Sequence, residues 1–171
     1  MKSLLFIHGP NGVGKSTTCA RLFRRLPNSS WLDSEWCRRI NPFDLTPEIE
    51  SLAERHVSVL LRGYLECSLV KHVIFCYGLH GPRQRIYDRV LHNLDDLSFH
   101  LLPITLTCSE EENTRRMIQD GRNAAGYMQH ALQTRVVYEG LPYPVLDSTR
   151  VPVEDAVEKI LALLQEDKQV V

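Results

Sequence analysis

The chain has 171 residues, 43% of them hydrophobic, and its acidic and basic side chains nearly cancel to a formal net charge of −1. This length is enough to bury one substantial core and too short for two ordinary domains, so we expect a single domain over residues 1–171. The balanced charge argues against binding to nucleic acid or to an anionic membrane by bulk electrostatics, and no apolar run approaches the roughly 20 residues that span a bilayer.

Hydrophobic patterning predicts an alternation of strands and helices. Short continuous apolar runs indicate strands buried on both faces of a sheet, and apolar residues at helical spacing indicate amphipathic helices. In chain order, we expect a strand at residues 4–7, a helix at 15–26, a strand at 31–32, a helix at 46–68, a strand at 73–77, a helix from after residue 82 to about 97, a strand at 101–107, helices at 109–120 and 125–139, a strand at 145–146 and a helix at 153–164. This alternation is typical of an α/β protein with a parallel sheet. Residues 166–171 are expected to fray.

A glycine-rich loop lies between the first expected strand and the first expected helix, where residues 9–17 read Gly-Pro-Asn-Gly-Val-Gly-Lys-Ser-Thr. This matches Gly-x-x-x-x-Gly-Lys-Ser/Thr, in which successive backbone N–H groups and the positive end of the following helix surround a phosphate chain. Lys15 is expected to reach the β- and γ-phosphates and to be catalytic, while the Ser16 hydroxyl completes a Mg²⁺ shell. The residues predicted to bind the nucleoside triphosphate are Gly9, Asn11, Gly12, Val13, Gly14, Lys15, Ser16 and Thr17.

Two acids follow the second expected strand, and in open parallel sheets ligands bind beyond the carboxyl ends of the strands. Asp33 is predicted to be catalytic and, with Glu35, to bind the substrate. A carboxylate there can accept a proton from an acceptor hydroxyl, orient it for in-line attack, or hold a metal-bound water. The alternative for Asp33 is a cap for a turn that begins at Ser34. Arg38 and Arg39 follow within two turns and either pair with an anionic acceptor or are solvated surface, and Arg38 is included among the predicted substrate-binding residues.

The turn after the third strand contains Gly78, His80, Gly81 and Arg83. Its glycines let backbone or substrate come close, and Arg83 is predicted to bind the substrate. Phosphoryl transfer needs little acid–base chemistry, so we assign His80 no central role.

Residues from about 110 to 139 are expected to form a small helical lid. The arginines of this segment are Arg115, Arg116, Arg122 and Arg135. Arginines that swing over a nucleotide can neutralise charge on the transferring phosphoryl group and exclude water. Arg122, in the break between two helices, has no helical partner and is predicted to be catalytic. Arg115 and Arg116 have an alternative as ion-pair partners of the acids four residues earlier.

The cysteines are Cys19, Cys37, Cys67, Cys76 and Cys108. This odd number without a Cys-x-x-Cys pair indicates reduced thiols. The first strand leads directly into the glycine loop and leaves no room for a signal peptide, so we expect a cytoplasmic protein.

The glycine loop, the acid after the second strand, the arginine-bearing lid and the short last strand together resemble the P-loop nucleoside and nucleotide kinases, a group that includes shikimate, gluconate and adenylate kinases and chloramphenicol phosphotransferase. Within this group, four segments are similar to the small bacterial broad-specificity nucleoside monophosphate kinases. These segments are Trp31-Leu32-Asp33-Ser34-Glu35-Trp36-Cys37, Asn41-Pro42-Phe43, Val73-Ile74-Phe75-Cys76 and Thr107-Cys108-Ser109-Glu110-Glu111. The resemblance implies a three-layer P-loop NTPase fold, a five-stranded parallel sheet of order 2-3-1-4-5, a lid, ATP and Mg²⁺ as cofactors, and Asp33 as the acceptor-side acid.

Two features depart from adenylate-type kinases. Those enzymes follow the third strand with Asp-Gly-x-Pro-Arg, whereas this chain has Tyr-Gly-Leu-His-Gly-Pro-Arg at residues 77–83, and its lid lacks an arginine-dense helix. The sequence therefore predicts an ATP-dependent kinase that phosphorylates a hydroxyl or phosphate of a small acceptor, with a nucleotide or nucleoside as the first candidate.

Other readings of the sequence stay open. An antibiotic or metabolite phosphotransferase of the same fold is the first alternative. A P-loop NTPase switch or a nucleotide-binding module is the second, although the chain contains no Asn-Lys-x-Asp sequence for guanine selection. The oligomeric state is left open.

Overall fold

The structure is a computed structural model that describes residues 1–42, 44 and 46–167 of the chain. Phe43, which belongs to one of the segments that carry the resemblance, and residues 168–171, where fraying is expected, lie outside the described residues.

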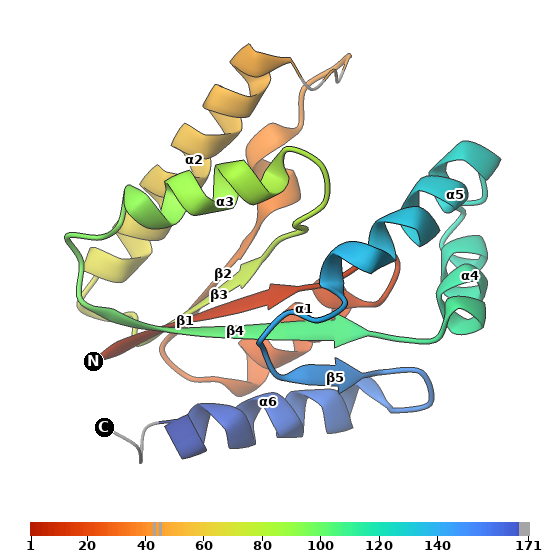
Figure 1. Cartoon of the computed structure of the whole chain (residues 1–171). Coiled ribbons are helices and arrows are strands. Elements are labelled where there is room, and N and C mark those ends of the chain that lie inside the picture. Colours follow the sequence, from red (N-terminus) through yellow and green to blue (C-terminus); the bar gives the residue numbers. More distant parts are fainter. Residues whose placement is uncertain (43, 45, 168–171) are drawn as a thin grey trace.

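The described elements alternate as the sequence predicts (Figure 1). They are β1 (Lys2–His8), α1 (Lys15–Arg25), β2 (Ser29–Asp33), the 3-10 helix η1 (Ser34–Arg38), α2 (Pro47–Glu66), β3 (His72–Cys76), α3 (Arg83–His92), β4 (Phe99–Thr107), α4 (Glu110–Gln119), α5 (Ala125–Gln133), the 3-10 helix η2 (Thr134–Tyr138), β5 (Val145–Asp147) and α6 (Val153–Asp167).

The five strands form one parallel sheet of order β2-β3-β1-β4-β5, so the expected topology is confirmed. The register places Cys76 of β3 beside Ile7 of β1 on one side and Asp33 of β2 on the other. The glycine loop, the acid after β2 and the turn after β3 therefore begin at the same edge of the sheet. This is the edge where ligands bind in open parallel sheets.

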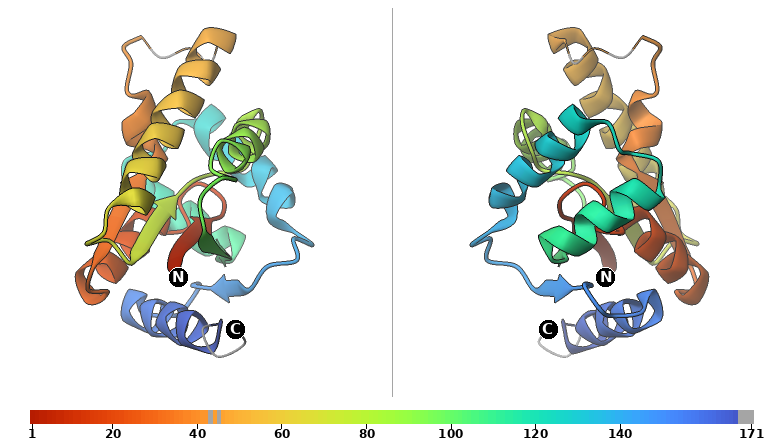
Figure 2. Two further views of the ribbon diagram at one scale, coloured as in Figure 1. Left: turned by 90° about the vertical axis from the view of Figure 1, so that its left-hand side faces the viewer. Right: turned by 90° about the vertical axis from the view of Figure 1, so that its right-hand side faces the viewer.

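Helices cover both faces of the sheet, and the side chains of successive residues in each central strand point to opposite faces. Leu4 and Phe6 of β1 pack with residues of α2 and α3, whereas Leu5 and Ile7 pack with residues of α1 and α6. Figure 2 shows α2 and α3 on the side of the sheet opposite to α6. The three-layer α/β fold is confirmed, and the apolar runs are explained because both faces of β1 and β3 are buried.

The segment expected to form a lid consists of α4, α5 and η2, which connect β4 to β5 beyond the carboxyl ends of the central strands (Figure 1). In the part of the chain that the structure describes, no helix combines the length and apolar character needed to cross a membrane. The five cysteines are free, and all except Cys67 are buried.

Two predicted helix ends are wrong. The helix expected to reach residue 97 ends at His92, because Leu94 and Leu97 donate backbone hydrogen bonds to residues three positions earlier, at 3.0 Å each. Leu94 is nevertheless fully buried, so a turn satisfies the apolar pattern as well as a helix does. The helix expected over residues 125–139 ends at Gln133, and its remainder is the 3-10 helix η2.

Candidate functional site

The glycine loop forms a sharp connection from β1 into α1. Gly14 has φ 96° and occupies the N-cap position of α1, a left-handed conformation that disfavours any residue with a Cβ. No side chain caps this helix, so the N–H groups of its first turn are available to a ligand. The loop therefore leads into an open helix N-terminus, an arrangement that binds phosphate groups in other proteins.

Lys15 folds back over the loop. Its Nζ donates hydrogen bonds to the carbonyl oxygens of Gly9 and Pro10, both at 2.8 Å. Burial lowers the pKa of the Lys15 ammonium, and the nearby positive charge of Arg83 acts in the same direction, while the Asp33 carboxylate and the Cys76 thiol oppose both. The base of the site is thus positively charged and partly desolvated, an environment that favours an anionic ligand.

Asp33 lies at the end of β2 and is only 4% exposed. Its Oδ2 accepts a hydrogen bond from the Ser16 hydroxyl at 2.7 Å, and its Oδ1 accepts one from the backbone N–H of Glu35 at 3.1 Å. The predicted cap of the turn is therefore present, as the N-cap of η1. The same carboxylate reaches the glycine loop with its other oxygen, so capping and a role in the site are compatible.

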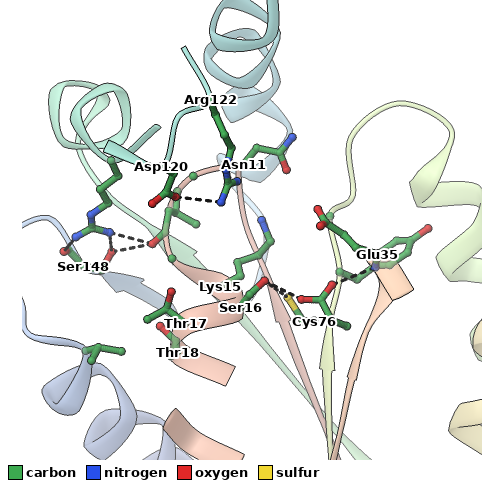
Figure 3. Close-up of a pocket in the computed structure, with 18 of the residues that line it drawn as sticks. Asn11, Lys15, Ser16, Thr17, Thr18, Glu35, Cys76, Asp120, Arg122 and Ser148 are labelled. Carbon is green, nitrogen blue, oxygen red and sulfur yellow. Dashed lines mark hydrogen bonds and ion pairs between the residues drawn. The ribbon is translucent and has the colours of Figure 1, made fainter. Parts of the chain in front are cut away.

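A cavity of about 320 Å³ extends from the glycine loop to the turn after β3 (Figure 3). Every predicted site residue lines it except Gly9, whose carbonyl holds Lys15 instead. Arg39 lies outside, in a neighbouring surface pocket that shares Glu35 and Arg38 with the cavity. The fold thus brings the residues predicted from the motif and from the strand ends into one site. Their roles stay predictions.

Arg83 begins α3 and lines the same cavity as the loop. Its Nη1 is so close to Gly78 that a Cβ there would be 3.1 Å from it. Burial lowers the pKa of the Arg83 guanidinium to about 10, with the positive charge of Arg38 as the second cause. Among the residues that the structure describes, no carboxylate forms an ion pair with Arg83. This end of the cavity is therefore prepared for a negative charge from a ligand.

Arg122 enters the site from the break between α4 and α5, and Figure 3 shows it reaching toward Asn11 of the glycine loop. It has no partner four residues away, as expected, but Asp120 accepts a hydrogen bond from its Nη2 at 3.0 Å. Both side chains are about half exposed, so this ion pair contributes little to stability.

Arg116 and Ser148 have contacts in the site that the sequence analysis did not assign. Arg116 pairs with Glu112 at 2.7 Å, as the spacing suggested, but its guanidinium also donates to the carbonyl oxygens of Val13 at 3.0 Å and Ser148 at 2.6 Å. Arg115 pairs with Glu112 as well, rather than with Glu111 four residues earlier. Ser148 directly follows β5. Ligands bind beyond the carboxyl ends of the strands, so this position could have been singled out from the sequence.

His80 is buried, with its Nδ1 3.4 Å from the Tyr138 hydroxyl. Burial, reinforced by the charges of Arg83 and Lys15, lowers its pKa to about 3. A histidine with this pKa stays neutral near pH 7, and the role of His80 stays a prediction.

No family model and no curated protein sequence matches the chain, but solved structures do. The tunicamycin resistance protein of Deinococcus radiodurans is similar with a TM-score of 0.68 and 20% sequence identity, over 96% of each chain. Shikimate kinase from Acinetobacter baumannii in complex with shikimate has a TM-score of 0.64 and 18% identity over 98% of this chain and 96% of that one. The APS kinase of Mycobacterium tuberculosis in complex with AMPPNP and APS has a TM-score of 0.66 and 13% identity, over 96% of this chain and 98% of that one.

The protein has the three-layer α/β fold of the P-loop kinases, and the resemblance inferred from the sequence motifs is confirmed at this level. The likeness extends over nearly the whole chain at identities of 13 to 20%. It therefore defines the fold, whereas the reaction and its acceptor are argued from the site.

Proposed function

We propose that this protein is an ATP-dependent kinase that transfers the γ-phosphoryl group to a small acceptor carrying a negative charge. One observation supports this most directly: the cavity that contains the glycine loop is also lined by Arg83, a partly buried residue without a carboxylate partner among the described residues. A nucleotide-binding module needs only the part of this cavity at the glycine loop, which we call the donor half. A kinase also needs a part that binds the acceptor, here the part at Arg83, which we call the acceptor half, within reach of the first.

ATP and Mg²⁺ are the proposed cofactors. The Ser16 hydroxyl and the Asp33 carboxylate adjoin each other at 2.7 Å and offer the hard oxygen ligands that Mg²⁺ prefers, either directly or through water. When bound, the ion neutralises charge on the β- and γ-phosphates. Lys15 supplies a second positive charge there by exchanging its carbonyl partners for phosphate oxygens.

The contact with Ser16 supports one of the three roles considered for Asp33. A carboxylate whose Oδ2 is bonded to the predicted metal ligand is well placed to hold a metal-bound water. Glu35 is exposed and also lines the cavity, so we propose that it, rather than Asp33, faces the acceptor hydroxyl. Arg122 is proposed to leave Asp120 and bind the transferring phosphoryl group when the triphosphate is present.

The first candidate acceptor is a nucleoside monophosphate, whose phosphate group fits the charge at Arg83. A second candidate is a hydroxylated antibiotic or anionic metabolite. It is favoured by the structural neighbours, which include the tunicamycin resistance protein, a gluconokinase from Sinorhizobium meliloti and shikimate kinase bound to shikimate. We propose the cytoplasm as the setting for either reaction, because its reducing conditions suit five free thiols.

An ATP-depletion screen of the purified chain with Mg²⁺ tests the proposal. The acceptors are nucleoside monophosphates, nucleosides, sugar acids, shikimate-like acids and hydroxylated antibiotics, each with ATP or GTP. We expect almost no hydrolysis without an acceptor and a strong response to one class, with a phosphorylated product in the mass spectrum. Rapid hydrolysis without any acceptor would favour an NTPase switch, and triphosphate binding with no turnover at all would favour a binding module.

A further inference from the structure

We propose that Asn113 of α4, oriented by Arg135 of η2, is a positioning residue that aims the backbone of the glycine loop at the phosphate chain. The inference rests on the proposed function only in so far as the loop binds a nucleotide. It is independent of the acceptor. Arg135 belongs to the segment expected to form a lid, so its place in the sequence suggests a contact with phosphate. The proposal instead gives it the role of orienting Asn113.

Side chains bind the carbonyl oxygens of the glycine loop at four positions. Lys15 binds those of Gly9 and Pro10, from within the loop itself. The other two are bound from outside the loop by residues of α4, which are more than 100 positions away in the sequence, and the Val13 carbonyl also accepts from Ser148 Oγ at 3.3 Å. Asn113 Nδ2 donates to the Asn11 carbonyl at 2.9 Å, and Arg116 Nη1 donates to the Val13 carbonyl at 3.0 Å.

A bound carbonyl fixes the direction of the next N–H group, because the two point in opposite directions across a planar trans peptide. The one cis peptide among the described residues is Asn41-Pro42, so the peptide between Asn11 and Gly12 is trans. When the Asn11 carbonyl points at Asn113, the Gly12 N–H points away from α4. Gly12 lines the cavity, so in this proposal its N–H is the one that faces the phosphate chain.

Arg135 determines the orientation of the Asn113 side-chain amide, that is, whether its nitrogen or its oxygen faces the glycine loop. Its Nη1 is 3.2 Å from Asn113 Oδ1, and its Nη2 donates to the Cys108 carbonyl at 2.6 Å. A guanidinium has only donors, so the amide must present its oxygen to Arg135 and its nitrogen to the Asn11 carbonyl. Asn113 is fully buried, so both contacts are shielded from bulk solvent. The reversed amide would place oxygen against oxygen at the loop.

Close packing holds this arrangement in place. A Cβ added to Gly12 would lie 2.5 Å from Asn113 Nδ2 and 2.6 Å from Met117 Cγ, so a residue larger than glycine does not fit. Met117, one turn after Asn113, is fully buried as well. The face of α4 that carries these residues therefore acts as a fixed wall behind the loop. A loop whose N–H groups are aimed beforehand binds phosphate without reorganising when the ligand arrives.

The test compares Asn113→Asp and Arg135→Met with the wild-type chain. Aspartate keeps an acceptor for Arg135 but replaces the donor to Asn11 by a second oxygen, whereas Arg135→Met removes what orients the amide. Matched controls are Asn93→Asp at the end of α3 and Arg25→Met on α1, which lie outside the cavity. Circular dichroism and thermal unfolding establish that each variant is folded.

Calorimetry then measures binding of AMPPNP with Mg²⁺ and of AMP. Loss of one buried hydrogen bond from an aimed donor is expected to weaken AMPPNP binding roughly tenfold or more in both variants. AMP and the controls should stay near wild-type values, because AMP lacks the β- and γ-phosphates that the loop is predicted to surround. A merely structural role would weaken AMP and AMPPNP alike.

Three outcomes overturn the inference. They are unchanged AMPPNP affinity in both variants, equal losses for AMP and AMPPNP, and a wild-type chain that does not bind AMPPNP. The last outcome would also remove the proposed kinase function. Normal AMPPNP binding in the wild type with no phosphorylated acceptor would remove only the kinase function and leave the inference standing.

Discussion

Replacing Asp33 by asparagine removes the negative charge but keeps a side chain of nearly the same shape, so the two contacts of Asp33 can be considered one at a time. The asparagine oxygen can still accept from the backbone N–H of Glu35, as Oδ1 does at 3.1 Å, so the cap of η1 is kept. The new Nδ2 lies where Oδ2 accepts from Ser16 at 2.7 Å, and the serine hydroxyl can accept from it after rotating. Because both hydrogen bonds survive with one reversed, we expect a stability change of about 1 kcal/mol or less.

The rate should respond far more strongly than the stability. Asparagine is neutral, so it neither holds a metal-bound water as a carboxylate does nor accepts a proton. Groups with these roles contribute about 10²- to 10⁴-fold, which corresponds to about 3 to 5 kcal/mol in the barrier. We therefore expect kcat to fall by at least about 100-fold, with AMPPNP affinity close to that of the wild type.

Steady-state kinetics over a range of Mg²⁺ and acceptor concentrations resolve the role of Asp33. A metal-water role predicts a higher Mg²⁺ requirement in the variant with an unchanged acceptor KM, whereas orientation of the acceptor hydroxyl predicts the reverse. Asp33→Ala is the matched variant, since it removes the cap as well and should cost additional stability. A rate for Asp33→Asn within a few fold of the wild type would refute the reasoning and leave Asp33 as a helix cap.

Three further predictions concern charge. Lys15→Ala should abolish transfer and weaken AMPPNP binding about 100-fold or more, measured by calorimetry, because a charge on the β- and γ-phosphates is lost; unchanged turnover would contradict the proposed mechanism. Arg83→Met should raise the acceptor KM roughly 10- to 100-fold with the ATP KM unchanged, while Arg85→Met, whose side chain is 67% exposed, should alter neither. His8 and His80 both have a pKa lowered to about 3, chiefly by burial. In the unfolded chain the histidine pKa is about 6.5, so between about pH 3 and pH 6.5 the unfolded chain binds more protons than the folded one. The free energy of unfolding should therefore fall as the pH drops below about 6.5, on the order of 1.4 kcal/mol per pH unit for each histidine. Urea unfolding at pH 7 and pH 5 measures this, and His8→Phe should lose less stability than the wild type; an equal loss would show that His8 does not contribute.

The fold could be predicted from the sequence wherever a pattern is local. Residues 4–7 and 73–77 are apolar without interruption because their strands are covered on both faces, and the buried patterns of β1 and β3 agree. The order of the strands came from the resemblance, since periodicity does not specify which strands are neighbours. The helix ends at residues 92 and 133 were missed because turns with bonds three residues apart bury the same side chains as a longer helix.

The set of residues that meet in the cavity was predictable to the same extent, although their roles are still predictions. Lys15 and Ser16 are found from their spacing because the loop that uses them is a single continuous segment. Asn113 and Arg116 carry no such signal, because each acts on a backbone carbonyl more than 100 residues away and any residue supplies a carbonyl. Only the folded chain shows that these carbonyls need donors and that α4 provides them.

The two halves of the cavity differ in a way that bears on specificity. In the donor half, side chains bind the carbonyl oxygens of Gly9, Pro10, Asn11 and Val13. We expect this half to bind a phosphate chain with no change beyond the exchange of the Lys15 partners, and not to discriminate between acceptors. In the acceptor half, burial lowers the pKa of the Arg83 guanidinium to about 10, which means that holding its charge there costs free energy until an anion arrives. An acceptor with a suitably placed negative charge recovers that free energy and a neutral one does not, so discrimination between acceptors should depend on Arg83 and not on the glycine loop.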